Sequence, residues 1–185
     1  MFIHGHGTGD RMLFGFTVLE LLMTVSIAGI LLAAAVPSFQ KFSQRQQMKA
    51  AVNTLQNDLM MSRSSAAHLG SRVVACPGSP AAGCSGNADW STGWIVFEDS
   101  NTDRLRQPGE TLIRRGQGIE HMVIRSNAGR THIRFLPDGS APGSNSSITF
   151  CGPGGPAQAR KLVISNVGRI RRDTVPDLDL SFCPT

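Results

Sequence analysis

The sequence predicts an α+β protein in which one long N-terminal helix packs on a mostly antiparallel β-sheet head. Three features predict this: an apolar run at residues 16–36, an amphipathic continuation, and short β-type segments after Gly70. With 185 residues, the chain is long enough for one globular domain and an appendage. We expect four parts: an N-terminal segment at 1–15, an apolar helix at 16–37, an amphipathic helix at 38–69 and a β-rich head at 70–185.

The apolar run is long enough to cross a membrane. Its 21 residues, 16–36, would span about 31 Å as a helix at about 1.5 Å per residue. A plain membrane anchor and a cleaved secretory signal are the two simplest interpretations. Glu20 fits neither well, because a carboxylate inside a membrane helix costs roughly 2.5–3.5 kcal/mol. Its presence indicates a specific partner.

The amphipathic helix follows Pro37, which should kink or loosen the backbone. Apolar side chains then recur every three or four residues, which is typical of a helix with one buried face. These side chains are Phe39, Phe42, Met48, Val52, Leu55 and Leu59. Gly70 is a plausible end of this helix.

The head should contain strands separated by Gly, Pro, Asn and Ser. We expect them at residues 72–76, 93–98, 111–114, 121–125, 131–136, 147–151, 161–165, 169–172 and 178–182. Trp90, Trp94 and the apolar residues 95–97 should build the core.

The segment Gly15-Phe16-Thr17-Val18-Leu19-Glu20-Leu21-Leu22 resembles the processing motif of type IV pilins and pseudopilins. The resemblance implies that a prepilin peptidase removes residues 1–15 by cutting between Gly15 and Phe16, and then methylates the Phe16 amine. It also implies that Glu20 meets this amine on a neighbouring pilin during assembly. The chain would be anchored once in the inner membrane, with a periplasmic head, before it enters a pilus at the cell surface.

The segments 89–99 (DWSTGWIVFED) and 108–110 (PGE) resemble the head of the FimT and GspH branch of this family, which consists of minor pilins and minor pseudopilins. The resemblance extends from Gly15 to the last expected strands and implies the type IV pilin fold.

Positive charge is concentrated in the C-terminal half. Residues 112–172 contain 10 Lys or Arg and 2 Asp or Glu, a net +8, whereas residues 16–111 contain 7 of each. Such a segment is suited to a polyanion. If Gly168 turns the chain into a strand, Arg169 and Arg171 share one face, about 6.6 Å apart, and Ile170 lies on the other. A solvated strand face is the simpler alternative.

Gly168-Arg169-Ile170-Arg171 is similar to the GRxR motif of FimT-type minor pilins, which bind DNA during natural transformation. The resemblance implies DNA as a partner. Because they lie in the same basic segment, further cations are expected as helpers: Arg172, Lys161, Arg160, Arg134 and Arg130. Because no base-reading motif is present, binding should be electrostatic and weak, with a Kd of about 10⁻⁴–10⁻⁶ M. A purely structural minor pilin for pilus initiation and a minor pseudopilin of a type II secretion system are the alternatives.

Four cysteines allow three disulfide pairings, of which Cys76–Cys84 and Cys151–Cys183 close the shortest loops. Their spacing is unlike that of a zinc site, so we expect disulfides in an oxidising compartment. Asp99, Asn101, Asp103 and Glu110 have the spacing of a calcium loop, but Arg104 occupies the glycine position. A turn rich in Asx residues explains them more simply, so no metal is predicted and calcium is kept only as the weaker alternative.

No nucleophile with a base, carboxylate pair or metal cluster is recognisable in the sequence, since the histidines are scattered. The sequence therefore predicts neither an enzyme nor a cofactor.

Overall fold

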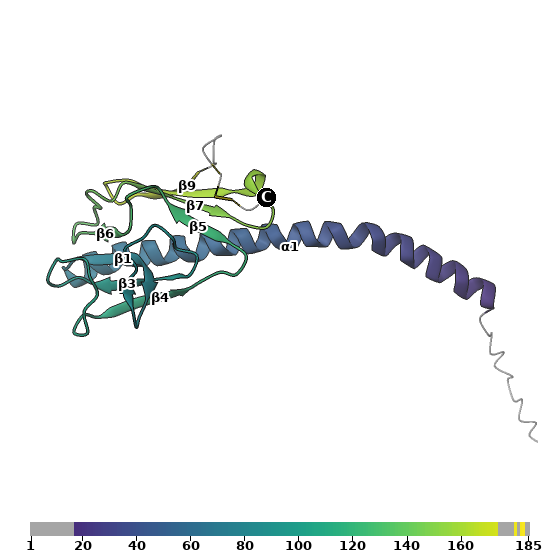
Figure 1. Ribbon diagram of the computed structural model, residues 1–185, viewed down its shortest axis with the longest axis horizontal. Helices are drawn as coiled ribbons and strands as arrows, with labels where there is room; N and C mark the ends of the chain where they lie inside the picture. The colour runs from purple at the N-terminus through teal and green to yellow at the C-terminus, as the bar shows by residue number, and fades with distance from the viewer. Residues whose placement is uncertain (1–16, 174–179, 181, 184–185) are drawn as a thin grey trace, which may run out of the picture. The chain divides into compact units, whose positions relative to one another are not determined.

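A computed structural model describes residues 17–173, 180, 182 and 183 (Figure 1). Helix α1 runs from Val18 to Leu69 and has 52 residues. Thr17 caps its start, because Thr17 Oγ1 accepts a hydrogen bond of 3.2 Å from the Glu20 backbone N–H. The helix ends before Gly70, whose φ of 63° lies in the left-handed region favoured by glycine. This end confirms the prediction.

Contacts divide the chain into two compact units, residues 1–40 and 41–185. In the first unit, the apolar side chains of α1 are exposed, and Pro37 lies within the helix without interrupting it. Among the described residues, α1 is the helix that is long and apolar enough to cross a membrane. In the most apolar stretch of 18 residues in this helix, no part is buried within the described structure.

In the second unit, α1 becomes amphipathic as predicted, but its buried face begins later. Met48, Val52, Leu55 and Leu59 are buried. The prediction was wrong for Phe39 and Phe42, which are 70% and 56% exposed. Their spacing matches the helical period, but the first residue of the hydrophobic core is Met48. Periodicity alone does not show where burial begins.

The first sheet has the order β2-β1-β3-β4. Strand β6 also pairs with β1, along Val73–Ala75. Its strands are β1 (Val73–Ser79), β2 (Gly83–Cys84), β3 (Gly93–Glu98), β4 (Leu112–Gln117) and β6 (Ile133–Phe135). Strand β1 continues through Pro77 to Ser79, three residues beyond the predicted end at Cys76. All of these pairings are antiparallel.

The second sheet has the order β5-β7-β8-β9 and is also antiparallel. Its strands are β5 (Val123–Ser126), β7 (Ser146–Cys151), β8 (Arg160–Ile164) and β9 (Ile170–Asp173), with a short 3₁₀ helix, η1 (Pro156–Gln158), before β8. The strand predicted at 178–182 falls largely outside the described residues, and Leu180 and Phe182 are not in a strand.

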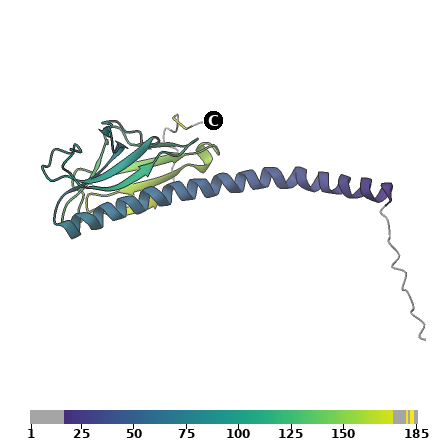
Figure 2. The same ribbon diagram turned by 90° about the horizontal axis from the view of Figure 1, so that it is seen from below.

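The main core lies between the second half of α1 and both sheets, which Figure 2 shows gathered on one side of that part of the helix. Trp90, Trp94 and residues 95–97 are fully buried, as predicted. Trp94 is fixed to the helix, since its Nε1–H donates to Asp58 Oδ2 at 2.8 Å. Gly116 on β4 leaves room for the indole, because a Cβ there would lie 1.9 Å from Trp94 Cε2. The observed architecture confirms the predicted α+β fold.

Candidate nucleic-acid interface

Gly168 sets the turn between β8 and β9. Its φ is 75°, and a Cβ at this position would lie 2.0 Å from the carbonyl oxygen of Gly139. The Ala141 backbone N–H also donates to Asn166 O at 2.8 Å, which fixes the turn against the loop after β6. Gly168 therefore has a structural reason to be glycine: it allows two loops to approach and aims the arginines that follow.

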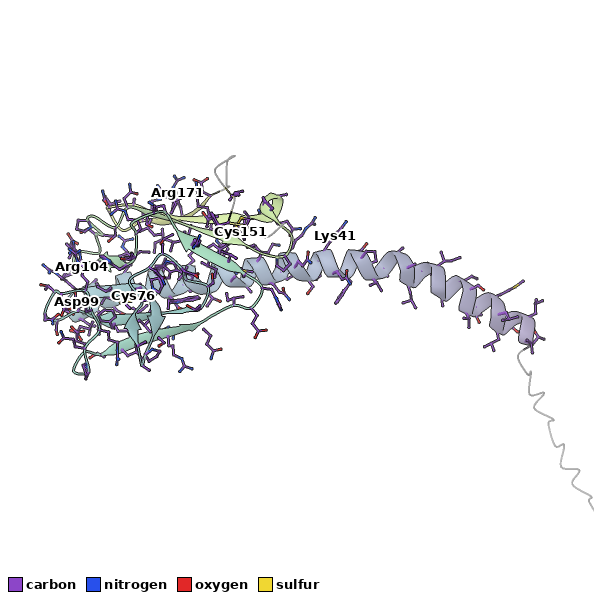
Figure 3. The ribbon with its side chains drawn as sticks, viewed as in Figure 1. Lys41, Cys76, Asp99, Arg104, Cys151 and Arg171 are labelled. Carbon is purple, nitrogen blue, oxygen red and sulfur yellow. A yellow bond between two sulfur atoms is a disulfide. The ribbon has the colours of Figure 1, made fainter. Side chains whose placement is uncertain are left out.

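Arg169 and Arg171 are both exposed, and Ile170 between them packs against the main core. This agrees with the alternation expected from the sequence. Strand β9, however, begins at Ile170. Arg169 closes the hairpin, since the Ser165 backbone N–H donates to Arg169 O at 3.0 Å. Figure 3 shows Arg171 on the second sheet, away from the disulfide residue Cys76 of the first.

Arg171 forms a salt bridge with Asp173, with Nη1 and Oδ2 3.2 Å apart. The two residues are separated by one position in β9 and therefore share a face. Sequence reasoning missed this pair, although the i, i+2 spacing of opposite charges in a predicted strand was the signal. Both side chains are partly exposed, so the pair adds little stability but offsets part of the Arg171 charge.

The expected helper residues lie on two different faces. Arg172 and Arg160 lie on the face that meets α1, because each is paired in register with a buried residue, Leu162 and Phe150 respectively. Lys161 lies on the opposite face, in register with Thr149 and Asp173. The helpers thus reach the β9 edge from both sides of the sheet.

Arg172 connects β9 to the helix, since its Nε–H donates to Gln56 Oε1 at 2.6 Å. A second helix residue, Arg63, donates from Nε to Gly139 O at 2.9 Å, beside the Gly168 turn. A hollow of about 530 Å³ lies here between α1 and the turn, lined by Gln56, Arg63, Asp138 and Arg169 among others. Hydrogen bonds with Ser140 hold the pKa of the Asp138 carboxyl below its ordinary value. The helix contribution was not predicted from the sequence.

The loop considered for calcium uses its acids as caps for backbone N–H groups. Glu110 accepts from Ser100 N at 3.1 Å and from Gln107 N at 3.0 Å. Asp103 accepts from Leu105 N at 2.7 Å, and Asn101 Oδ1 from Asp103 N at 3.2 Å. Within the described part of the chain, no group of three His, Cys, Asp or Glu residues is placed to hold a metal. These contacts match the interpretation as an Asx-rich turn.

Asp99, the first acid of that loop, is buried, and its Oδ1 lies 3.4 Å from the Arg104 backbone N–H (Figure 3). Nearby, burial lowers the pKa of His132, and the positive charges of Arg104, Arg134 and Arg130 lower it further, whereas Asp99 opposes them. This cluster joins the 99–104 loop to β6 and takes no part in the Arg169 turn.

Both shortest-loop disulfides, Cys76–Cys84 and Cys151–Cys183, are present. The second holds Cys183 on the outer face of the second sheet, where Phe182 lies over the Arg125 guanidinium at 5.9 Å. The expected processing residues Gly15 and Phe16 lie outside the described residues, and Glu20 is exposed in the first turn of α1. A carboxylate in that turn is favoured by the helix dipole.

The family model for the type II transport protein GspH matches residues 51–168, more than half of the chain. The chain belongs to the GspH family. Two crystal forms of the type IV minor pilin FimU of Pseudomonas aeruginosa PAO1 share its fold, with 19% identity and TM-scores of 0.54 and 0.51. The matches cover 71% and 68% of this chain and 92% and 91% of FimU. No curated protein matches the sequence.

The minor pseudopilin EpsH of Vibrio cholerae is similar over 69% of this chain and 97% of its own, with 8% identity and a TM-score of 0.49. This chain therefore belongs to the GspH family and has the fold of a minor type IV pilin. Such subunits associate with other pilins and are structural components, not enzymes. The apolar N-terminal part of α1 is consistent with membrane anchoring before assembly.

Proposed function

We propose that this chain is a FimT-like minor pilin that binds extracellular DNA without sequence preference for uptake in natural transformation. Arg169 and Arg171 would contact the phosphates, with Arg172, Lys161 and Arg160 as helpers. The observation that carries the proposal is the β8–β9 hairpin, in which Ile170 is anchored in the core while the arginines on either side are exposed. Arginine suits this role because its planar fork binds phosphate oxygens bidentately.

The proposal includes the assembly route expected from the N-terminal motif. A prepilin peptidase cuts between Gly15 and Phe16 in the inner membrane, and Glu20 pairs with the methylated amine of a neighbouring pilin. The exposed apolar face of α1 supports this route, since those side chains need a bilayer or other subunits around them. DNA is then captured at the cell surface by the head.

The test is DNA binding by the full chain in a nonionic detergent, followed by fluorescence anisotropy of a labelled duplex at about 50 and 200 mM salt. We expect the Arg169→Gln/Arg171→Gln variant to bind roughly tenfold more weakly than the unmodified chain. A matched control is Arg104→Gln/Arg115→Gln, which removes the same charge from exposed positions outside the hairpin. Equal losses in both variants would show a diffuse basic surface instead of a site.

A minor pseudopilin of a type II secretion system is the second candidate, favoured by the description of the matching family model. It predicts that DNA does not bind at low salt. A purely structural pilin would behave in the same way, and in cells the Arg169→Gln/Arg171→Gln variant would then impair assembly. DNA capture predicts the reverse: pili assemble and transformation is lost.

A further inference from the structure

Helix α1 carries three residues that face the β9 edge at regular spacing: Lys49, Gln56 and Arg63. Positions seven residues apart differ by only about 20° around a helix, so these three lie on one line. The line is about 21 Å long, since fourteen residues rise about 1.5 Å each. Lys49 and Arg63 are exposed at its two ends, and Gln56 in the middle holds Arg172.

A second hollow, of about 230 Å³, lies at the Lys49 end of this line. Four cations line it, together with Asp173: Lys49 from α1, Arg160 and Lys161 from β8, and Arg172 from β9. The first hollow, with Arg63 and Arg169, lies at the other end. Gln56 lines the first hollow and Arg172 lines the second, so their hydrogen bond connects the linings of the two hollows.

We call the strip that joins the two hollows, from Lys49 to Arg63 on α1 with the facing residues of β8 and β9, the α1–β9 seam. Three of its arginines donate hydrogen bonds to neutral acceptors. Arg172 donates to the Gln56 amide oxygen, and Arg63 donates to the Gly139 carbonyl. Arg160 donates from Nη1 to the Ala159 carbonyl at 2.8 Å. A neutral acceptor orients a guanidinium without offsetting its charge, and each guanidinium has five N–H donors. The seam therefore presents positive charges in fixed orientations, and its guanidinium groups keep N–H donors that these contacts do not use.

The seam has six cations, Lys49, Arg63, Arg160, Lys161, Arg169 and Arg172, and two acids, Asp138 and Asp173. Asp173 is engaged by Arg171. The resulting excess of positive charge runs in a line, not in a round patch. A linear polyanion with closely spaced charges matches this shape.

We infer that the α1–β9 seam is the path of the DNA backbone on this head, and that Lys49 and Arg63 of the helix contact its phosphates. This rests on the proposed function and extends it from the hairpin to the helix. At about 3.4 Å per nucleotide in one strand, the seam spans roughly six phosphates. Arg169 lies at one end of this path, whereas Arg171, paired with Asp173 on the outer side, contributes less.

The experiment compares the full chain, in nonionic detergent, with a Lys49→Gln/Arg63→Gln variant in the same anisotropy assay. We expect roughly tenfold weaker binding, and a slope of log K against log salt that is shallower by about 1.4–1.8, because two phosphate contacts are lost. The charge-preserving variant Lys49→Arg/Arg63→Lys should restore both quantities to within about twofold. Arg104→Gln/Arg115→Gln serves again as the charge-matched control.

Each outcome decides the inference. If the unmodified chain binds DNA, the Arg169→Gln/Arg171→Gln variant is weakened and the helix variant equals the control, the path is overturned while the proposed function stands. If the unmodified chain does not bind DNA at low salt, both fail. If it binds anionic phosphatidylglycerol vesicles but not DNA, the seam is a lipid-headgroup site and the inference is overturned. Loss of binding without a change in salt slope would mean altered folding, and it also counts against the path.

Discussion

The two edges of the head at which α1 meets a sheet use the same amino-acid type in opposite ways. At the β4 edge, Arg114 donates from Nε to Asp58 Oδ1 at 3.2 Å, and Asp58 also accepts from Trp94. At the β9 edge, Arg172 donates to Gln56. The two acceptors, Gln56 and Asp58, have a single residue between them on the helix, yet Asp58 is a buried carboxylate and Gln56 is an amide.

The difference has a clear physical meaning. The Asp58 carboxylate offsets the charge of Arg114, so this contact at the β4 edge stabilises the fold and offers little charge to a ligand. An amide holds the side chain in place and leaves its charge to act on a ligand. Positions on one helix can therefore divide stability and binding between the two sheets, which is the basis of the predictions below.

The largest effect is expected from Asp58→Ala. It leaves the fully buried Trp94 Nε1–H without an acceptor and removes the partner of Arg114, which is itself half exposed. The head should lose about 3 kcal/mol of unfolding free energy, whereas Gln56→Ala should cost less than about 1 kcal/mol. Urea unfolding followed by tryptophan fluorescence measures this, because both tryptophans of the chain, Trp90 and Trp94, lie in the head. Equal losses would remove the distinction between the edges.

Gly168→Ala tests the turn that aims the β9 arginines. Its Cβ would combine a left-handed backbone with a 2.0 Å approach to Gly139 O, so we expect a loss of about 2–3 kcal/mol. Gly129→Ala is the matched control, since Gly129 has the same φ of 75° but nothing within 4 Å of its Cβ position. It should cost only about 1 kcal/mol. If the two variants unfold at the same urea concentration, packing against Gly139 is not the reason for glycine at 168.

Gln56→Glu converts the β9 edge into a copy of the β4 edge. The new carboxylate would pair with Arg172, so DNA binding should weaken about threefold while stability changes by less than about 0.5 kcal/mol. Asp173→Asn should act in the opposite direction and strengthen binding about threefold. Anisotropy titrations at low salt measure both. If both substitutions weakened DNA binding, the net charge along the seam would not determine the affinity.

The smallest effect concerns His132, on the side of the first sheet. Burial and the neighbouring arginines hold its pKa below the unfolded value of 6.5, so the unfolded chain binds more protons between the two values. The stability that His132 contributes is present above pH 6.5 and is lost as pH falls through its folded pKa. We expect a loss below about 1 kcal/mol between pH ~7.5 and ~5, part of which His132→Gln abolishes. Urea unfolding at each pH measures it, and an unchanged pH dependence in the variant would exclude His132 as the source.

The sequence was sufficient to predict the fold because its signals are local. Gly70 ends the helix, Trp90 and Trp94 enter the core, and antiparallel strands follow turn residues. Its failures came from the same rules. Phe39 and Phe42 fit the helical period, but periodicity does not tell where the head begins to cover the helix.

The candidate site could be predicted only in part. The exposed pair Arg169 and Arg171 follows from strand alternation alone. The roles of Lys49, Gln56 and Arg63 depend on which helix face meets β9, and this is fixed by sheet order, which no local pattern encodes. The calcium-like spacing likewise could not show that Asp103 and Glu110 were already occupied by backbone N–H groups.

The two disulfides differ in the length of chain that they close, 8 residues for Cys76–Cys84 and 32 for Cys151–Cys183. Synthesis runs from the N-terminus, so Cys84 emerges soon after Cys76 and long before Cys151. Each cysteine therefore finds its native partner as the next one to appear, and oxidation in order of emergence gives the correct connectivity. A head oxidised in this order needs no shuffling of mispaired bonds, because the Cys76–Cys84 loop can close before Cys151 is available.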